Sequence, residues 1–529
     1  LFTRNNDFPV EYHPDESGKA IQIMSDSQQR NFKHPLLMLE AANLMKQWTF
    51  GPDDPRGADM REVVIVGRRT SALIASIGVF ALALAGWAAY GLPGLVIGGL
   101  TMALCPPLVV YAHYFKEDAS LAGGIMLAIL GARLVISSKS ELTQLLSALV
   151  LGVGCGVAMS GKYVGAGTIV PALFTLLIAR KLTSWWSIPT RIAVFAIAVT
   201  GTVITINYRA FVDWTSLQVS AQAESNLQAE VEHGQQGHSG LRLPAPNPWC
   251  LTIARSEMMP HIWAFMAVGL VWLAFRRQFG RWGFVLLAFL LTFSFELSYN
   301  AIPFARYALP ITLCAYFVAS QMASYVVHDL WQKRAVWGAA AMGVCAVVIL
   351  LTQGSRAANF NEQFRDDSRQ RVREWIAKNL PPAALITCDS YASLHTEGDP
   401  WRFPQQSPLT QRIQVNGFFA ADAGETPQDL ANSGTEYVVA AWSSYDRFFE
   451  PGIEGMPGDE TWLERHRKFY EELFSKGKLV WSSVPSPSTH SYTNMEIRVY
   501  QISQLANQPG DNGSGSKPGV GGLLRNLFR

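Results

Sequence analysis

A long stretch without ionised side chains limits what this chain can fold into more than any other feature of its sequence. Residues 70–115 contain no Asp, Glu, Lys or Arg over about 46 positions. A membrane-spanning helix needs roughly 20 apolar residues, so the stretch is long enough for two spans. Gly91-Leu-Pro-Gly94 provides a turn between them. We therefore expect an integral membrane protein.

Eight more apolar segments bring the expected number of spans to about ten, in a bundle that covers residues 63–352. They lie at about 119–137, 143–160, 163–179, 191–207, 260–275, 283–300, 307–327 and 336–352. Hydrophobic residues make up 49% of the chain and charged residues only 16%, a balance typical of membrane proteins. The net charge of +2 and the lack of a basic recognition motif argue against nucleic-acid binding.

The basic residues between the spans predict the orientation of the bundle. Cytoplasmic loops are rich in Lys and Arg, and alternating the loops places every basic cluster on one side. These clusters are Arg133 with Lys139, Arg180-Lys181 with Arg191, Arg276-Arg277 with Arg281, and Lys333-Arg334. The opposite, outer side then receives residues 1–62, a long polar loop at 208–258 and everything after residue 352. An outer N-terminal segment also predicts a preceding first span that this sequence does not contain.

Three polar regions complete the predicted organisation, which is mainly α. Residues 1–62 form an outer loop with an acidic motif and two interfacial helices, at 15–30 and 35–48. Residues 353–505 alternate helical and strand patterns and predict a soluble, extracytoplasmic α/β domain. Its expected elements are helices at 366–380 and 462–474 and strands at 384–388, 436–442, 479–484 and 496–502. The tail, 506–529, is rich in Gly, Ser and Pro and is expected to be disordered.

Carboxylates and cations suited to group transfer gather in the predicted outer loops. Asp15 and Glu16 end the motif Tyr12-His-Pro-Asp-Glu16, and Asp118 ends Tyr114-Phe-Lys-Glu-Asp118. A carboxylate at the membrane surface can accept a proton, although such acids also cap helices or sit solvated in a first turn. Candidate phosphate ligands are Lys33, His34, Lys116, Lys162 and Arg306. An interfacial lysine more often reaches towards lipid headgroups.

The order and sidedness of these motifs resemble those of the GT-C membrane glycosyltransferases. The nearest likeness is to bacterial members of glycosyltransferase family 39, relatives of protein mannosyltransferases and lipid A aminoarabinose transferases. The matching segments are Tyr12-His-Pro-Asp-Glu16, Asn31-Phe-Lys-His-Pro-Leu36, Tyr114-Phe-Lys-Glu-Asp118, Phe304-Ala-Arg-Tyr-Ala-Leu-Pro310 and the region that opens at Asp366. The resemblance covers roughly residues 10–500. It implies a polytopic transmembrane helical bundle of GT-C type with a C-terminal soluble α/β domain, in a bacterial cytoplasmic membrane.

The resemblance also implies an activity, the inverting transfer of a sugar from a polyprenyl-phosphate donor to a lipid, glycan or protein acceptor outside the cytoplasm. Asp15 would then be the catalytic base, and Glu16 and Asp118 would assist it, orient the acceptor or hold a divalent metal ion. Arg306 with Tyr307, together with Lys33, His34, Lys116 and Lys162, would bind the donor phosphate. No cofactor is certain.

Two other classes of protein stay open at this point. One is a transporter or flippase of lipid-linked glycans, and the other is a non-catalytic membrane assembly subunit. Transporters usually carry charged or broken helices at the bilayer midplane, whereas the charges here lie in the outer loops. The enzyme is therefore the favoured interpretation.

Overall fold

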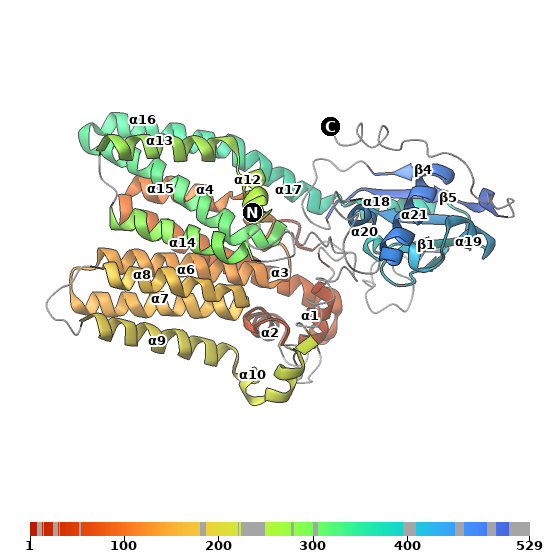
Figure 1. Cartoon of the computed structure of the whole chain (residues 1–529), viewed down its shortest axis with the longest axis horizontal. Coiled ribbons are helices and arrows are strands. Elements are labelled where there is room, and N and C mark those ends of the chain that lie inside the picture. Colours follow the sequence, from red (N-terminus) through yellow and green to blue (C-terminus); the bar gives the residue numbers. More distant parts are fainter. Residues whose placement is uncertain are drawn as a thin grey trace.

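The computed structural model describes the chain except for residues 8–12, 14, 25–29, 31, 52–53, 180–186, 221, 224–248, 277–279, 300–304, 395–408, 450–459, 484–492 and 507–529. A bundle of long helices and a C-terminal α/β domain follow each other along the longest axis of the molecule (Figure 1). The predicted tail, apart from Ala506, and most of the predicted loop 208–258 lie outside the described residues.

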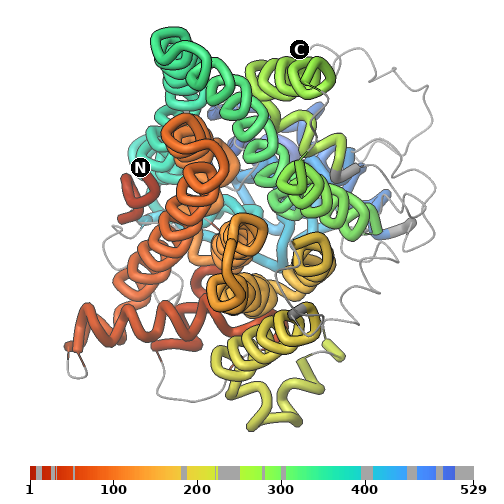
Figure 2. Tube along the Cα trace, turned by 90° about the vertical axis from the view of Figure 1, so that its left-hand side faces the viewer, coloured from red at the N-terminus to blue at the C-terminus, as the bar shows by residue number. Residues whose placement is uncertain are grey.

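The bundle is built from apolar helices that lie side by side, seen along their axes in Figure 2. Its longer helices are α3 (Met60–Tyr90), α6 (Glu117–Ser137), α7 (Glu141–Gly161), α8 (Ile169–Ile178), α9 (Ser187–Ile206), α13 (Pro260–Arg276), α14 (Arg281–Leu297), α15 (Leu309–Lys333) and α16 (Ala335–Ile349). Among the described residues, six helices are long and apolar enough to cross a membrane, or up to eight if each of two bent helix pairs is one span.

The expected ten spans are therefore not ten straight helices, although each predicted segment falls on an apolar helix or helix pair. The second segment forms η2 (Gly94–Gly98), α4 (Gly99–Ala103) and α5 (Pro106–Ala112), with a bend of 54° before Pro106-Pro107. Proline removes a backbone donor and clashes with the preceding turn, which explains the break. The other bent pair joins α12 (Trp249–Glu257) to α13 at 104°. The segment 163–179 divides into η3 (Tyr163–Thr168) and α8.

Small residues let α6 and α7 pack backbone to backbone in the middle of the bundle. Gly124 and Gly131 on α6 face Ala158 and Leu151 on α7. A Cβ atom at Gly154 of α7 would lie only 2.7 Å from the Cα atom of Ala128 and 2.8 Å from the carbonyl carbon of Leu127. Apolar side chains gain little from leaving lipid, so close approach of this kind is what holds membrane helices together.

A cap of polar helices covers the end of the bundle that faces the C-terminal domain, which we call the domain end (Figure 1). It contains α1 (Asp15–Met24), α2 (Leu37–Phe50), η1 (Pro55–Ala58) and α10 (Tyr208–Val212). The Asp59 side chain accepts a hydrogen bond from the Glu62 amide at 3.0 Å and so starts α3. Asn207 accepts from the Leu36 amide at 2.8 Å and donates to the Ser160 hydroxyl at 2.9 Å. The cap is thereby tied to the ends of α7 and α9.

The C-terminal domain contains a five-stranded sheet in the order β2-β1-β3-β5-β4. β1 pairs in parallel with β2 and β3, whereas β5 runs antiparallel to β3 and β4. The strands are β1 (Leu385–Cys388), β2 (Arg412–Gln414), β3 (Tyr437–Ala441), β4 (Lys478–Ser482) and β5 (Ile497–Gln501). The helical elements are α18 (Ser368–Asn379), η6 (Ser390–Ala392), η7 (Ala420–Asp422), α19 (Pro427–Asn432), α20 (Trp442–Tyr445), η8 (Asp446–Phe448), α21 (Glu460–Lys476) and η9 (Ser503–Leu505). All four predicted strands and both predicted helices are present.

The junction between the two parts is helical and brings the domain close to the cap. α16 runs through η5 (Leu350–Gly354) into α17 (Ser355–Arg365), so the boundary expected at residue 352 falls inside a continuous helical run. The His113 ring stacks on Phe364 of α17 with ring centroids 4.3 Å apart. Arg4 forms an ion pair with Glu362 at 2.6 Å. Through these contacts, the N-terminal residues and the loop before α6 pack against the helix that leads into the domain.

The packing of α6 on α7 predicts opposite effects for two glycine substitutions. Gly154→Ala should destabilise the protein by about 1–3 kcal/mol, because its new methyl group meets backbone that cannot move away. Gly201→Ala on α9 should be neutral or stabilising, since no atom lies within 4 Å of its Cβ position. Thermal melting of both variants in detergent measures this, and equal melting temperatures would contradict the close approach.

Candidate active site

Four segments that are distant in sequence meet at the domain end of the bundle. They are the start of α1, the loop before α6, the end of α7 and η4 (Ala305–Ala308). We call the side chains that they bring together the charged cluster: His13, Asp15, Lys19, Lys116, Glu117, Asp118, Lys162 and Arg306. Asp15, Lys116, Asp118, Lys162 and Arg306 were all predicted as site residues. The structure connects them through ion pairs and hydrogen bonds.

A fully buried ion pair between Glu16 and Arg68 lies next to the charged cluster and supports it. The Nε and Nη2 atoms of Arg68 donate to the two carboxylate oxygens of Glu16 at 2.9 and 2.7 Å. The Phe115 amide donates to the same carboxylate at 2.9 Å. Both charged side chains have 0% exposure. Glu16 was expected to assist catalysis or bind a metal ion, but these contacts engage both of its oxygens and give it a structural place.

Three lysine–carboxylate pairs form the body of the cluster. Lys116 pairs with Asp15, Lys19 pairs with Glu117, and the Lys162 Nζ atom lies 2.8 Å from Asp118 Oδ1. Glu117 and Asp118 open α6, where the helix dipole favours negative charge. One oxygen of each, Glu117 Oε2 and Asp118 Oδ2, is buried without a hydrogen-bond partner in the described part of the chain.

His13 and Tyr307 link the cations to one another. The His13 Nε2 atom lies 3.1 Å from Lys116 Nζ and 3.0 Å from Arg306 Nη1. The Tyr307 ring centroid lies 4.4 Å from Lys162 Nζ and 5.3 Å from the Arg306 guanidinium carbon. These cation–π contacts hold Lys162 and Arg306 on one ring.

The cluster carries four cations, Lys19, Lys116, Lys162 and Arg306, against three carboxylates, so its formal charge is 4 − 3 = +1. Burial, and then the Arg306 charge, lower the pKa of Lys116 to about 8. Burial also lowers the pKa of Lys162, but the Asp118 carboxylate outweighs it, and the net shift is upwards. A partly buried group of cations with a net positive charge is suited to binding a phosphate.

Asp15 is the accessible carboxylate of the cluster, with 47% of its side chain exposed. Partial burial raises its pKa, but His13 and Lys116 outweigh this effect and hold the pKa well below its usual range. Burial, followed by the Lys116 charge, lowers the pKa of His13 itself, so this imidazole is neutral at neutral pH. At neutral pH, where His13 is uncharged, Lys116 is the cation in contact with Asp15.

The other predicted site residues lie at the edge of the cluster. Burial lowers the pKa of the half-buried His34, and the charges of Glu117 and Lys19 also act on it. Lys33 is half-buried beside it, and its role stays a prediction. Among the residues that the structure describes, no three His, Cys, Asp or Glu side chains gather to hold a metal ion, and the metal role considered for Glu16 and Asp118 stays a prediction.

Sequence reasoning missed His13, Lys19 and Arg68. His13 lies within the acidic motif and could have been included on that ground. Arg68 lies two residues before the stretch without ionised side chains, and an ionisable residue in a membrane helix is by default a functional candidate. Lys19 stands four residues after Asp15, a spacing that indicates a pair within one helix. Its actual partner is Glu117, 98 positions along the chain, which no local pattern reveals.

Comparison with solved structures finds similar chains, while no protein-family model and no curated protein matches. ArnT from Cupriavidus metallidurans, in the apo state, is 14% identical with a TM-score of 0.46, and 96% of each chain is covered. The oligosaccharyltransferase of Archaeoglobus fulgidus, in the apo form, is 10% identical with a TM-score of 0.45, over 91% of this chain and 77% of that one. The S. cerevisiae protein O-mannosyltransferase Pmt1-Pmt2 complex bound to the sugar donor is 18% identical with a TM-score of 0.32, over 38% and 30%.

ArnT and the protein O-mannosyltransferase are proteins of the kind that the sequence motifs resemble. The function proposed below rests on the charged cluster. The long apolar helices make the chain an integral membrane protein, mainly α, with a helical bundle followed by a C-terminal α/β domain.

The buried pair predicts a large loss of stability when one partner is removed. Arg68→Ala should cost about 3–5 kcal/mol, because it leaves the Glu16 carboxylate buried without its counter-ion. Arg56→Ala is the matched control, since its pair with Asp54 lies in solvent, and its melting temperature should equal that of the wild type. Thermal melting in detergent distinguishes the two variants. An Arg68→Ala protein that melts at the wild-type temperature would show that the pair does not stabilise the fold.

Proposed function

We propose that the protein is a membrane glycosyltransferase that moves a sugar from a polyprenyl-phosphate donor to a hydroxyl of a lipid, glycan or protein acceptor. The observation that carries the proposal is the accessible Asp15 carboxylate beside the buried cations Lys116 and Lys162 and the half-buried Arg306. Glycosyl transfer from a lipid phosphate needs both parts, a base for the attacking hydroxyl and cations for the phosphate that leaves.

The proposed reaction assigns a role to each part of the cluster. Arg306 and Lys116 bind the donor phosphate, and Lys162, held by Asp118, adds positive charge beside them. The acceptor oxygen attacks the anomeric carbon and forms the new glycosidic bond with inversion. The bond between that carbon and the phosphate oxygen breaks, and its electron pair leaves with the polyprenyl phosphate. The hydroxyl proton passes to Asp15.

Donor binding would also activate the base. A carboxylate with a strongly depressed pKa is a poor base, and His13 and Lys116 together hold the pKa of Asp15 low. A donor phosphate that draws Lys116 towards itself weakens this pair, and the pKa of Asp15 then rises. In this proposal, Asp15 accepts the proton only when the phosphate is in place.

The arrangement of charge supports an extracytoplasmic site in a bacterial cytoplasmic membrane. The cluster and the α/β domain share the domain end of the bundle (Figure 1). The described residues of the predicted basic clusters, among them Arg133, Arg281 and Arg334, lie at the opposite ends of α6, α14 and α15. We call this end of the bundle the loop end. Basic loops favour the cytoplasmic side, so the cluster would face outwards.

The central prediction concerns Asp15→Asn in the purified protein. The substitution keeps the shape and removes the basic oxygen, so single-turnover transfer from a radiolabelled polyprenyl-phosphate sugar should fall about 10²–10⁴-fold. Thermal stability should fall moderately, because the substitution removes the counter-ion of the buried Lys116 but keeps a side-chain oxygen to which Lys116 can donate, so turnover is compared per folded protein.

Asp7→Asn, an exposed change in the same N-terminal region, is the control and should keep full activity. Near-wild-type turnover of Asp15→Asn would place the base elsewhere. A transporter would move the labelled donor across a vesicle membrane without cleaving it, and an assembly subunit would do neither, so the same assay separates the three classes of protein.

The pKa of Lys116 predicts how donor binding depends on pH. Lysine is charged below its pKa, so the affinity for a polyprenyl phosphate should fall as the pH rises through about 8. Lys116→Arg keeps its charge over this range and should bind with little change between pH 7 and 9. Lys162→Arg should keep the wild-type profile, because the pKa of Lys162 is raised. Titrations at several pH values measure these affinities, and a flat wild-type profile would exclude Lys116 from phosphate binding.

A further inference from the structure

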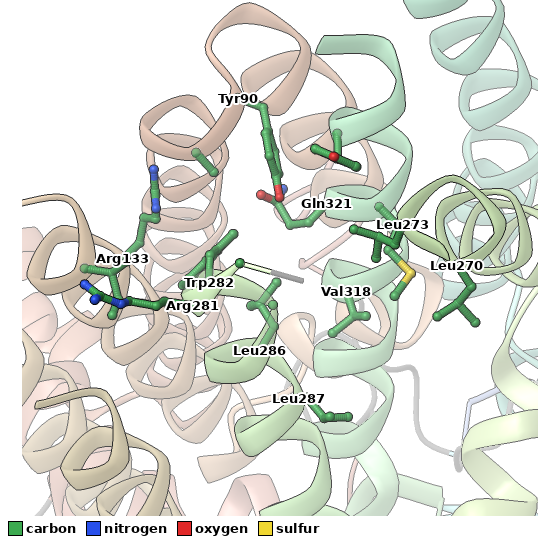
Figure 3. A pocket seen from close by; sticks show the side chains of 16 residues that line it. Tyr90, Arg133, Leu270, Leu273, Arg281, Trp282, Leu286, Leu287, Val318 and Gln321 are labelled. Carbon is green, nitrogen blue, oxygen red and sulfur yellow. The ribbon is translucent and has the colours of Figure 1, made fainter. Parts of the chain in front are cut away.

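A cavity lies at the loop end of the bundle, away from the charged cluster. It has a volume of about 560 Å³ and is lined by residues of α3, α6, α13, α14 and α15 (Figure 3). This volume is in the range of sites that hold small molecules. Along α6, Arg133 at the cavity is 16 residues from Glu117 at the cluster, which corresponds to roughly 24 Å of helix. The cavity is therefore a separate site.

The walls of the cavity are apolar on one side and basic on the other. Figure 3 shows Leu270 and Leu273 on one side, with Arg133 and Arg281 together on the other. Arg281 is the exposed first residue of α14, and no acidic partner is found for it among the residues that the structure describes. The Arg133 guanidinium lies over the Trp282 ring, 5.6 Å from its centroid. The basic side therefore offers positive charge to a ligand.

Buried polar groups without partners point to a ligand in this cavity. Gln321 is 2% exposed, yet neither its amide nitrogen nor its amide oxygen has a hydrogen-bond partner within the described residues. The same holds for the indole nitrogen of Trp282, whose side chain is also buried. An unmade hydrogen bond at a buried group costs about 1–3 kcal/mol, so such groups are commonly satisfied by a bound molecule.

We infer that the cavity binds one anionic phospholipid from the membrane leaflet at the loop end. The lipid phosphate lies against Arg281 and Arg133, one acyl chain enters between the leucines, and the ester and glycerol oxygens meet Gln321 and Trp282. Arginine suits a phosphate because it can donate two hydrogen bonds at once. The polyprenyl tail of a donor bound at the charged cluster, roughly 24 Å away along α6, could also reach the cavity. Such an apolar chain alone would give no role to the two arginines.

Native mass spectrometry of the purified full chain tests the inference, with phosphatidylglycerol, phosphatidylcholine and a polyprenyl phosphate titrated separately. Phosphatidylglycerol should bind more tightly than phosphatidylcholine. Arg281→Ala should weaken phosphatidylglycerol binding about fivefold, as expected for one arginine near an anionic lipid. Val318→Trp, which fills the cavity, should weaken the binding of both phospholipids. Arg334→Ala is the matched control, because it removes an exposed arginine at the same end that does not line the cavity.

Two results would overturn the inference. If Arg281→Ala and Arg334→Ala weaken phosphatidylglycerol binding equally, the lipid is attracted by the general positive charge of this end and not by a site. A loss of polyprenyl phosphate binding alone in Val318→Trp would assign the cavity to the tail of the donor. Should Val318→Trp fail to fold, Arg281→Ala still decides the matter, since it changes an exposed side chain.

Discussion

The buried pair of Glu16 and Arg68 is the interaction on which the charged cluster depends. It fixes the start of α1 against α3, and the same carboxylate accepts a hydrogen bond from the Phe115 amide. Residue 16 is therefore held at residue 115, although 99 positions separate them in the sequence. The neighbours of these residues, Asp15 and Lys116, must then meet, and they form an ion pair. One buried carboxylate thus brings two of the proposed catalytic groups together.

Stability alone does not account for the number of buried charges at this end of the bundle. Moving two ions out of water costs several kcal/mol for each ion, and apolar side chains of similar volume often stabilise a protein as well or better. The cluster nevertheless contains two largely buried lysine–carboxylate pairs and a third whose lysine is buried, with Lys116, Glu117 and Asp118 exposed by 3% or less. What such pairs provide is a set of fixed charges that an incoming phosphate can meet without first ordering flexible side chains.

The sequence predicted which segments meet far better than it predicted which side chains pair. Apolar runs and alternating loops placed Asp15, Asp118 and Arg306 on one side, because the length of a span and the sign of its loops are local properties. The pairing of Lys19 with Glu117 depends on how α1 lies against α6, and tertiary packing decides this. The distinction between Asp15 and Glu16 has the same origin, since two adjacent acids look alike until one of them is buried against Arg68. β2 was missed because its three residues, with exposed Arg412 and Gln414, carry no apolar alternation.

In the proposed reaction, the uneven exposure of the cluster would give the two substrates different places. Asp15 exposes 47% of its side chain, whereas its partner Lys116 exposes only 4%. An acceptor that approaches from outside the bundle therefore meets the carboxylate first, and a phosphate must reach the deeper lysine. Because Lys116 lies against Asp15, His13 and, through His13, Arg306, a phosphate bound there would lie next to the base. Inversion needs the hydroxyl and the phosphate on opposite faces of the anomeric carbon, so in the proposed reaction Lys116 would leave Asp15 as it binds the phosphate, which is the same movement that would raise the pKa of Asp15.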